Sequence, residues 1–221
     1  MTSVPVVQLT GVSKSFQSAG GTSIVLDGVD LMIEPGQKAS LVGPSGSGKS
    51  TLLSLIAGLL RPDIGTVALD GVPLSGLDDG ERAVLRTKRV GIALQSENLI
   101  PFLSALENVE LALGFGNRRS GLGRARELLN RMGVAHRARH RPRQLSGGEA
   151  QRVSLAVALA NDPAILLADE MVSQLDAATA GAVTRDIFDA DMAVLFVTHD
   201  LALADRADLR LRLRDRQVVT R

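Results

Sequence analysis

The chain contains the segment Gly43-Pro44-Ser45-Gly46-Ser47-Gly48-Lys49-Ser50-Thr51, which matches the pattern G-x-x-x-x-G-K-[ST] at every fixed position. Residues 38–42 before it are typical of a short buried strand, and residues 52–57 after it are typical of a helix that ends at Gly58. A chance glycine-rich turn would lack this order of strand, loop and helix. We therefore predict that the segment binds the phosphates of a nucleotide.

The residue types of this segment suit phosphate. Gly46 and Gly48 let the backbone curl so that successive N–H groups point inward, and the start of the following helix adds a positive dipole. Lys49 is expected to reach the β- and γ-phosphates, and Ser50 to ligate Mg²⁺. The predicted nucleotide-binding residues here are Gly43, Pro44, Ser45, Gly46, Ser47, Gly48, Lys49, Ser50 and Thr51.

The composition sets the limits within which partners can be inferred. The 221 residues suffice for one large domain with an inserted lobe. With 25 basic and 24 acidic residues the net charge is +1, so we expect no nucleic-acid partner. The chain has no cysteine, which excludes disulfides and thiolate metal sites, and we expect neither a signal peptide nor a membrane span.

The N-terminal part predicts paired strands at residues 6–9 and 23–26, joined by a turn at 18–21. Phe16 is the only aromatic residue before the phosphate-binding segment. It either stacks on a nucleotide base or is a core or strand-end residue, and sequence physics alone favours the second interpretation.

Two further strands are predicted at residues 65–71 and 89–95. The second ends in Gln95, and ligands gather where parallel strands end. Gln95 either faces the phosphate site or is merely solvated.

Residues 104–133 show a helical period with a glycine-rich break at 114–123. The break and the helix after it are basic, so this lobe either has a solvated face or lies close to anionic lipid headgroups or an acidic partner. The basic residues are Arg118, Arg119, Arg124, Arg126, Arg131, Arg137, Arg139, Arg141 and Arg143.

Two polar sites follow. A long helix with apolar periodicity begins at Ser146, Gly147 and Gly148, which form a second anion site.

A continuous apolar run at residues 164–168 is typical of a buried parallel strand, and it ends in Asp169 and Glu170. Adjacent carboxylates beside a phosphate loop favour a shared cation, so we expect Asp169 to hold Mg²⁺ and Glu170 to polarise the attacking water.

The C-terminal part predicts a helix at 177–188, a buried strand at 193–197 and a one-face-buried strand at 209–214. His199 follows the second of these and would lie on the same sheet edge as Gln95 and Asp169. It is either structural or contacts the γ-phosphate.

These motifs in this order resemble the nucleotide-binding subunit of the ATP-binding cassette (ABC) transporters, and the resemblance spans essentially the whole chain. Its most specific element is Leu145-Ser146-Gly147-Gly148-Glu149, in phase with the phosphate loop and the acidic strand end. The regions 95–101 and 106–109 are similar to the lipoprotein-releasing, macrolide-export and cell-division ATPases of that family. The resemblance implies an α/β P-loop NTPase with a mainly parallel central sheet, an N-terminal antiparallel β-subdomain and an inserted α-helical subdomain at about 96–160, within a single domain spanning 1–221.

The resemblance also assigns roles and partners. Phe16 matches the adenine-stacking position, Gln95 the link between the γ-phosphate, Mg²⁺ and the membrane partner, and His199 the switch histidine. ATP and Mg²⁺ are the implied cofactors. Two copies are expected to pair head to tail with two composite ATP sites, in which Ser146, Gly147 and Gly148 of one copy close on the ATP of the other. An integral membrane permease is the implied partner, so the chain is expected to be peripheral at the cytoplasmic face of the inner membrane, with indirect membrane contact.

One segment departs from the family pattern. Met171 and Val172 follow Glu170 where the family usually carries Pro-Thr, so the backbone there is expected to be free and hydrolysis to be slower or more dependent on a partner. The segment 177–193 also looks short for the family. An ATPase motor of a permease is favoured by Lys49, Asp169, Glu170 and His199; an ATP-gated regulatory module without solute transport is the alternative, and a soluble cassette acting on ribosomes or DNA is weaker.

Overall fold

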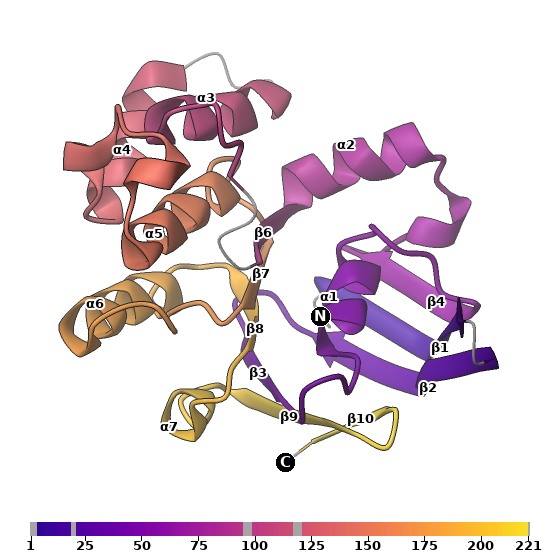
Figure 1. Ribbon diagram of the computed structural model, residues 1–221. Coiled ribbons are helices and arrows are strands. Elements are labelled where there is room, and N and C mark those ends of the chain that lie inside the picture. The colour runs from indigo at the N-terminus through magenta and orange to yellow at the C-terminus, as the bar shows by residue number, and fades with distance from the viewer. Residues whose placement is uncertain (1–3, 19–20, 95–98, 117–120, 221) are drawn as a thin grey trace. The chain divides into compact units, whose positions relative to one another are not determined.

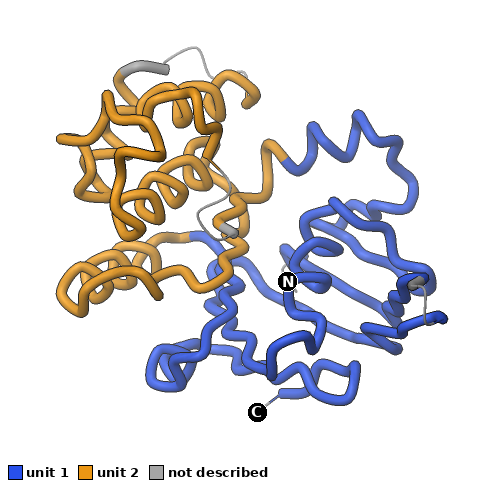
Figure 2. The backbone as a smooth tube through the Cα atoms, in the orientation of Figure 1, with its two compact units in different colours: residues 1–86, 192–221 blue, residues 87–191 orange. Residues whose placement is uncertain are grey.

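The computed structural model describes residues 4–18, 21–94, 99–116 and 121–220. Figure 1 shows the order of helices and strands along the chain. Figure 2 divides the chain into two compact units, of residues 1–86 with 192–221 and of residues 87–191. Each unit is described by itself.

The first unit begins with an antiparallel sheet in the order β2-β1-β4-β5. The first residues of strand β1 alternate: Val7 and Leu9 are buried, whereas Gln8 and Thr10 are exposed. This period of two buries one face of the sheet. The strands are β1 Val7–Ser18, β2 Gly21–Ile33, β4 Ile64–Leu69 and β5 Val72–Pro73.

The same unit holds four strands in the order β10-β9-β3-β8. Strand β3 is parallel to both β8 and β9, so the carboxyl ends of these three strands lie at one edge. Strand β8 is buried throughout, as its unbroken apolar run predicts. The strands are β3 Lys38–Val42, β8 Ala193–Val197, β9 Leu209–Arg214 and β10 Gln217–Thr220.

Two helices of the first unit adjoin these strands: α1 Lys49–Ile56 contacts β4, and α7 Leu201–Ala204 contacts β3. Helix α1 ends because Gly58 adopts a left-handed backbone with φ +66°, which glycine tolerates. A 3₁₀ turn, η1, covers Leu74–Gly76, and helix α2, Asp79–Arg89, leads out of this unit. The large side chains that are fully buried here include Leu26, Ile33, Leu41, Leu52, Leu53, Leu55, Ile56, Leu69 and Phe196.

The second unit contains two parallel strands, β6 Val90–Leu94 and β7 Ile165–Asp169, together with a group of helices. Helices α3 Ala105–Phe115, α4 Gly121–Arg131 and α5 Gly147–Ala158 contact one another, and α5 contacts β6. The remaining elements are η3 Ala135–Arg137, η4 Pro142–Gln144 and α6 Ala177–Phe188. Its fully buried large side chains include Leu113, Leu128 and Leu129.

The predicted strands at 38–42 and 193–197 and the predicted helix at 177–188 are confirmed residue for residue. Helix α1 begins at Lys49, inside the phosphate-binding segment, whereas the apolar pattern predicted a helix only from 52. The predicted break at 114–123 was too wide, since α3 continues to 115 and α4 begins at 121. Within the described ranges, no helix has the length and apolar character needed to cross a membrane.

Candidate nucleotide-binding site

The phosphate-binding segment begins directly after β3 and runs into the first turn of α1, in the predicted order of strand, loop and helix. Gly46 and Gly48 have positive φ angles of +74° and +105°. A Cβ atom on Gly48 would lie 2.6 Å from Cγ1 of Val25, and one on Gly43 would lie 2.7 Å from the carbonyl oxygen of Leu213. Gly43 is therefore required because a neighbour lies too close for a Cβ atom, and Gly46 because its φ angle is positive. Gly48 is required for both reasons.

Lys49 is folded into this loop. Its side chain is 9% exposed, and its Nζ donates hydrogen bonds to the carbonyl oxygens of Gly43 at 2.9 Å and Pro44 at 2.8 Å. These bonds hold the ammonium group against the backbone of the phosphate-binding loop. The hydroxyl of Ser47 is buried and has no hydrogen-bond partner among the described residues, and an anion in the loop would supply an acceptor for it.

His199 lies beside the start of the loop. A cavity of about 430 Å³ is lined by Gly43, Pro44 and His199, together with Val42, Thr198, Leu201 and Arg212. The exposed histidine lies two residues after the end of β8, and the next residue, Asp200, caps α7 by accepting from the backbone nitrogens of residues 202 and 203. A buried strand and a capped helix thus fix the turn on which His199 is carried.

Phe16 is an exposed residue near the end of β1, which excludes a core position and agrees with the strand-end interpretation, while its stacking on a base stays a prediction. Its side chain is 41% exposed and lies opposite Ser23 of β2. The Nζ of Lys14 lies 5.5 Å from the ring centroid and is also 2.7 Å from Asp63 Oδ1. The same hairpin carries Val25, which lies next to Gly48. An exposed ring on a hairpin that borders the phosphate loop leaves a face for a base.

In the second unit, the two predicted carboxylates lie at the end of β7, Asp169 as its last residue and Glu170 just after it. Asp169 is half-buried and pairs in register with Leu94, the last residue of β6. Glu170 follows with φ +55°, a left-handed backbone that is uncommon outside glycine. Its carbonyl oxygen accepts hydrogen bonds from the backbone nitrogen and the hydroxyl of Ser173, at 3.2 and 3.1 Å. Gln95 lies outside the described residues.

The predicted anion site at residues 146–148 forms the N-terminus of α5. Ser146 caps the helix: its Oγ accepts from the backbone nitrogen of Glu149 at 3.2 Å, while Glu149 Oε2 accepts from the backbone nitrogen of Ser146 at 2.8 Å. A Cβ on Gly148 would lie 2.8 Å from the carbonyl oxygen of Gln174, and one on Gly147 would overlap the Gln174 side chain. The two glycines let residue 174 pack directly on the helix start.

Two residues that support this region were not predicted from the sequence. Arg137 donates from Nε to Glu149 Oε1 at 2.7 Å. The pKa of Glu149 is lowered to about 2, first because its carboxylate accepts the backbone N–H of Ser146 and next because it accepts from the Arg137 guanidinium.

Gln151 is buried on α5 and makes hydrogen bonds to the backbone on either side of the segment 171–173. The sequence does not single it out, because Glu149, Arg152 and Ser154 are polar residues of the same helix.

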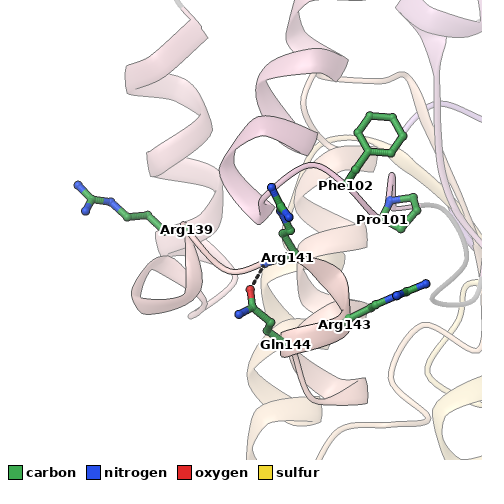
Figure 3. Close-up of a pocket in the computed structure, with 6 residues that line it drawn as sticks. All are labelled: Pro101, Phe102, Arg139, Arg141, Arg143 and Gln144. Carbon is green, nitrogen blue, oxygen red and sulfur yellow. Dashed lines mark hydrogen bonds between the residues drawn. The ribbon is translucent and has the colours of Figure 1, made fainter.

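Turn residues of the second unit and η4 form a basic groove of about 580 Å³, lined by Pro101, Phe102, Arg139, Arg141, Arg143 and Gln144 (Figure 3). Phe102 is 69% exposed. Buried Asn108 fixes the turn before α3, because its amide accepts from the backbone nitrogen of Ile100 at 2.8 Å and donates to the carbonyl oxygen of Ser104 at 2.9 Å. The groove therefore presents arginine side chains and the exposed ring of Phe102, and Asn108 fixes the turn that carries this ring.

These features, taken with the comparisons, define the class of protein. The ABC transporter family matches residues 26–173, so the chain belongs to the ABC transporter family. The chain is the ATP-binding subunit of an ABC transporter and hydrolyses ATP to drive transport.

Individual relatives cover the chain almost completely. It is 45% identical over 223 residues to the lipoprotein-releasing system ATP-binding protein LolD of Nitrobacter hamburgensis. The aligned region covers 98% of this chain and 96% of that protein. It is 44% identical over 217 residues to LolD 2 of Caulobacter vibrioides, with 96% and 95% covered.

A solved structure confirms the fold class. The ATP-binding cassette MJ0796, in a dimeric post-hydrolysis state bound to ADP and Pi, has a TM-score of 0.91 and 38% identity, with 96% of each chain covered. The predicted α/β architecture, with an antiparallel N-terminal sheet, a mixed but mostly parallel sheet and a helical insertion, is confirmed. The expectation of one domain spanning 1–221, with a helical subdomain at about 96–160, stays a prediction.

Proposed function

We propose that this chain is the ATPase motor of a lipoprotein-releasing exporter, acting on a separate membrane permease. The observation that carries the proposal is the phosphate loop, with Lys49 held in it and His199 beside it, in a chain 45% identical to a LolD protein. The lipoprotein substrate is inferred from the names of the relatives alone.

Each predicted residue takes a role in this proposal. The loop from Gly43 to Thr51 cradles the triphosphate of ATP, Lys49 exchanges its carbonyl partners for the β- and γ-phosphates, and Phe16 stacks on the adenine. Glu170 polarises the attacking water, while His199 and Gln95 contact the γ-phosphate and the water.

Mg²⁺ fits the donors that are present. The predicted ligands, Ser50, Gln95 and Asp169, offer a hydroxyl, an amide and a carboxylate oxygen, which are the hard ligands this ion prefers. Within the part of the chain that the structure describes, no cluster of three or more histidine, cysteine or acidic side chains could hold a metal by itself. This suits Mg²⁺, which takes few protein ligands and completes its shell with phosphate and water. Bound there, it would neutralise charge on the phosphates.

The proposal includes a two-fold dimer with two composite sites. The dimeric state of the MJ0796 cassette supports it. The capped helix start at Ser146, Gly147 and Gly148 has the dipole and exposed backbone suited to the γ-phosphate of ATP held by a second copy. Hydrolysis would remove that anion and reopen the dimer.

The basic groove supplies the surface for the permease. Its occupant would be a cytoplasmic segment of the permease that carries acidic side chains and an apolar residue, because the groove offers three arginines around exposed Phe102. The groove begins at Pro101, which follows the predicted γ-phosphate contact Gln95 closely in the sequence. The chain would thus be peripheral at the cytoplasmic face of the inner membrane.

The test is copurification with a tagged Glu170→Gln variant from detergent-solubilised membranes in Mg-ATP. A multi-span permease is expected, and adding Arg141→Glu and Arg143→Glu should abolish its recovery while the ATP dimer remains. Arg126→Glu, an exposed arginine on α4 outside the groove, is the matched control and should retain the permease. Recovery of no membrane protein, or of ribosomal or DNA-repair components, would overturn the motor proposal.

A further inference from the structure

The side chain of Gln151 connects helix α5 to the backbone that carries Glu170. Its Nε2 donates a hydrogen bond to the carbonyl oxygen of Glu170, and its Oε1 accepts one from the backbone nitrogen of Gln174 at 3.2 Å. Gln151 is only 8% exposed, so its amide group makes both bonds from a buried position. A buried amide that uses donor and acceptor on one short segment fixes that segment at two points.

The segment held in this way has an unfavourable backbone. Glu170 adopts φ +55°, which costs a residue with a Cβ on the order of 1 kcal/mol or more unless the surroundings impose it. Three donors converge on its carbonyl oxygen: Gln151 Nε2 and the backbone nitrogen and hydroxyl of Ser173. These bonds fix the plane of the peptide after Glu170, and that plane determines the direction in which the Glu170 side chain leaves the backbone.

No proline follows Glu170 to restrain this turn. Met171 is buried and anchors the segment on one side, but its φ is not fixed by a ring. The expectation that the backbone is free beyond Glu170 does not match the structure. Gln151 and Ser173 donate hydrogen bonds to the carbonyl oxygen of Glu170, and Gln151 also accepts one from the backbone nitrogen of Gln174. Of these two residues, Gln151 is the one whose restraint comes from a different element, since Ser173 belongs to the same turn.

We propose that Gln151 is a positioning residue, which holds the Glu170 carboxylate in the orientation needed to polarise the attacking water. The inference rests on the proposed role of Glu170 in hydrolysis. Gln151 contacts neither nucleotide nor water in this proposal; it acts through the carbonyl of Glu170. The expected consequence is an effect on the rate of the chemical step without an effect on ATP binding.

Gln151→Met tests this, because methionine has a similar length and apolar bulk but no N–H donor. We expect kcat to fall about 10- to 100-fold, as for a catalytic group displaced by about 1 Å, while the KM for ATP stays within about twofold. Gln151→Glu keeps an acceptor for the Gln174 nitrogen but places a carboxylate against the Glu170 carbonyl, so its kcat should fall at least as far. Ser154→Ala, a buried serine on the same helix, is the matched control and should leave kcat unchanged.

A second measurement separates positioning from a merely structural role. In the Glu170→Gln background, adding Gln151→Met should cause no further loss of residual hydrolysis and should leave ATP-dependent dimerisation, measured by size exclusion, intact. If Gln151→Met lowers ATP affinity and dimerisation in step with kcat, or leaves kcat at the wild-type value, the proposal is overturned. If Glu170→Gln alone hydrolyses ATP at the wild-type rate, the assigned role of Glu170 is wrong, and that outcome is read independently of the Gln151 variants.

Discussion

Arg137 Nε lies 2.7 Å from Glu149 Oε1, and the other carboxylate oxygen of Glu149 accepts the backbone nitrogen of Ser146 at 2.8 Å. A guanidinium group from η3 thus holds the carboxylate that closes the start of α5. Because Ser146 is the first residue of the predicted anion site, this ion pair sets the geometry of a site to which Arg137 does not itself belong.

Removing the arginine should loosen this helix start. We expect Arg137→Ala to lower the free energy of unfolding by about 0.5–2 kcal/mol, the range for a weakened N-cap. It should also weaken ATP-dependent dimerisation, because the dimer contact uses the same residues. Urea unfolding and size exclusion with ATP measure the two effects. Arg126 is an exposed arginine on α4, and Arg126→Ala should change neither the free energy of unfolding nor dimerisation. Equal effects from both variants would show that Arg137 does not support the start of α5 specifically.

Stability in acid should depend on Glu149. Its pKa is lowered from the usual 4.5 to about 2, so the folded state binds its proton less readily than the unfolded chain does. The contribution is therefore complete above pH 4.5 and is lost as the pH falls from there toward 2. We expect urea midpoints to drop between pH 5 and pH 3, and to drop less in Glu149→Gln. An identical acid dependence in the two proteins would contradict this assignment.

Much of the fold could be predicted because its strands are apolar runs between turn residues. The strands at 38–42 and 193–197 and the helix at 177–188 carry this pattern in full. The start of α1 could not be predicted in this way, because Lys49, Ser50 and Thr51 are polar and give no helical period. Its position follows from the left-handed backbone of Gly48 just before it.

The candidate site divides along a similar line. The places of motif residues such as Lys49, Asp169 and His199 could be predicted because each lies at or just after a strand end or in the phosphate loop, whereas their roles stay predictions. Gln151 and Arg137 could not, because their partners lie elsewhere in the sequence: the partner of Gln151 is the carbonyl of residue 170, and Arg137 is one of many arginines in its region. Only the folded chain identifies which of these polar groups is paired.

Lys49 should be required for nucleotide binding but not for folding. In the structure it bonds to the carbonyls of Gly43 and Pro44, which water can replace in part, whereas no other described side chain of the loop carries a positive charge. We expect Lys49→Ala to keep a Tm within a few degrees of wild type and to lose the rise in Tm that saturating ATP gives the wild type. Thermal unfolding with and without Mg-ATP measures both, and a retained ATP shift would exclude Lys49 as a phosphate ligand.

The exposed ring of Phe16 gives a prediction about the base. If it stacks on adenine, Phe16→Ala should weaken ATP binding by about 1–3 kcal/mol, as for other base–aromatic contacts, and should leave binding of inorganic triphosphate unchanged. Ile24→Ala is the matched control, because this side chain is 42% exposed on the neighbouring strand of the same hairpin. Both ligands are measured by calorimetry on the Glu170→Gln protein, so that hydrolysis does not interfere. Equal losses for ATP and triphosphate would mean that Phe16 supports the phosphate loop rather than the base, whereas equal losses from Phe16→Ala and Ile24→Ala would place the effect in the hairpin as a whole.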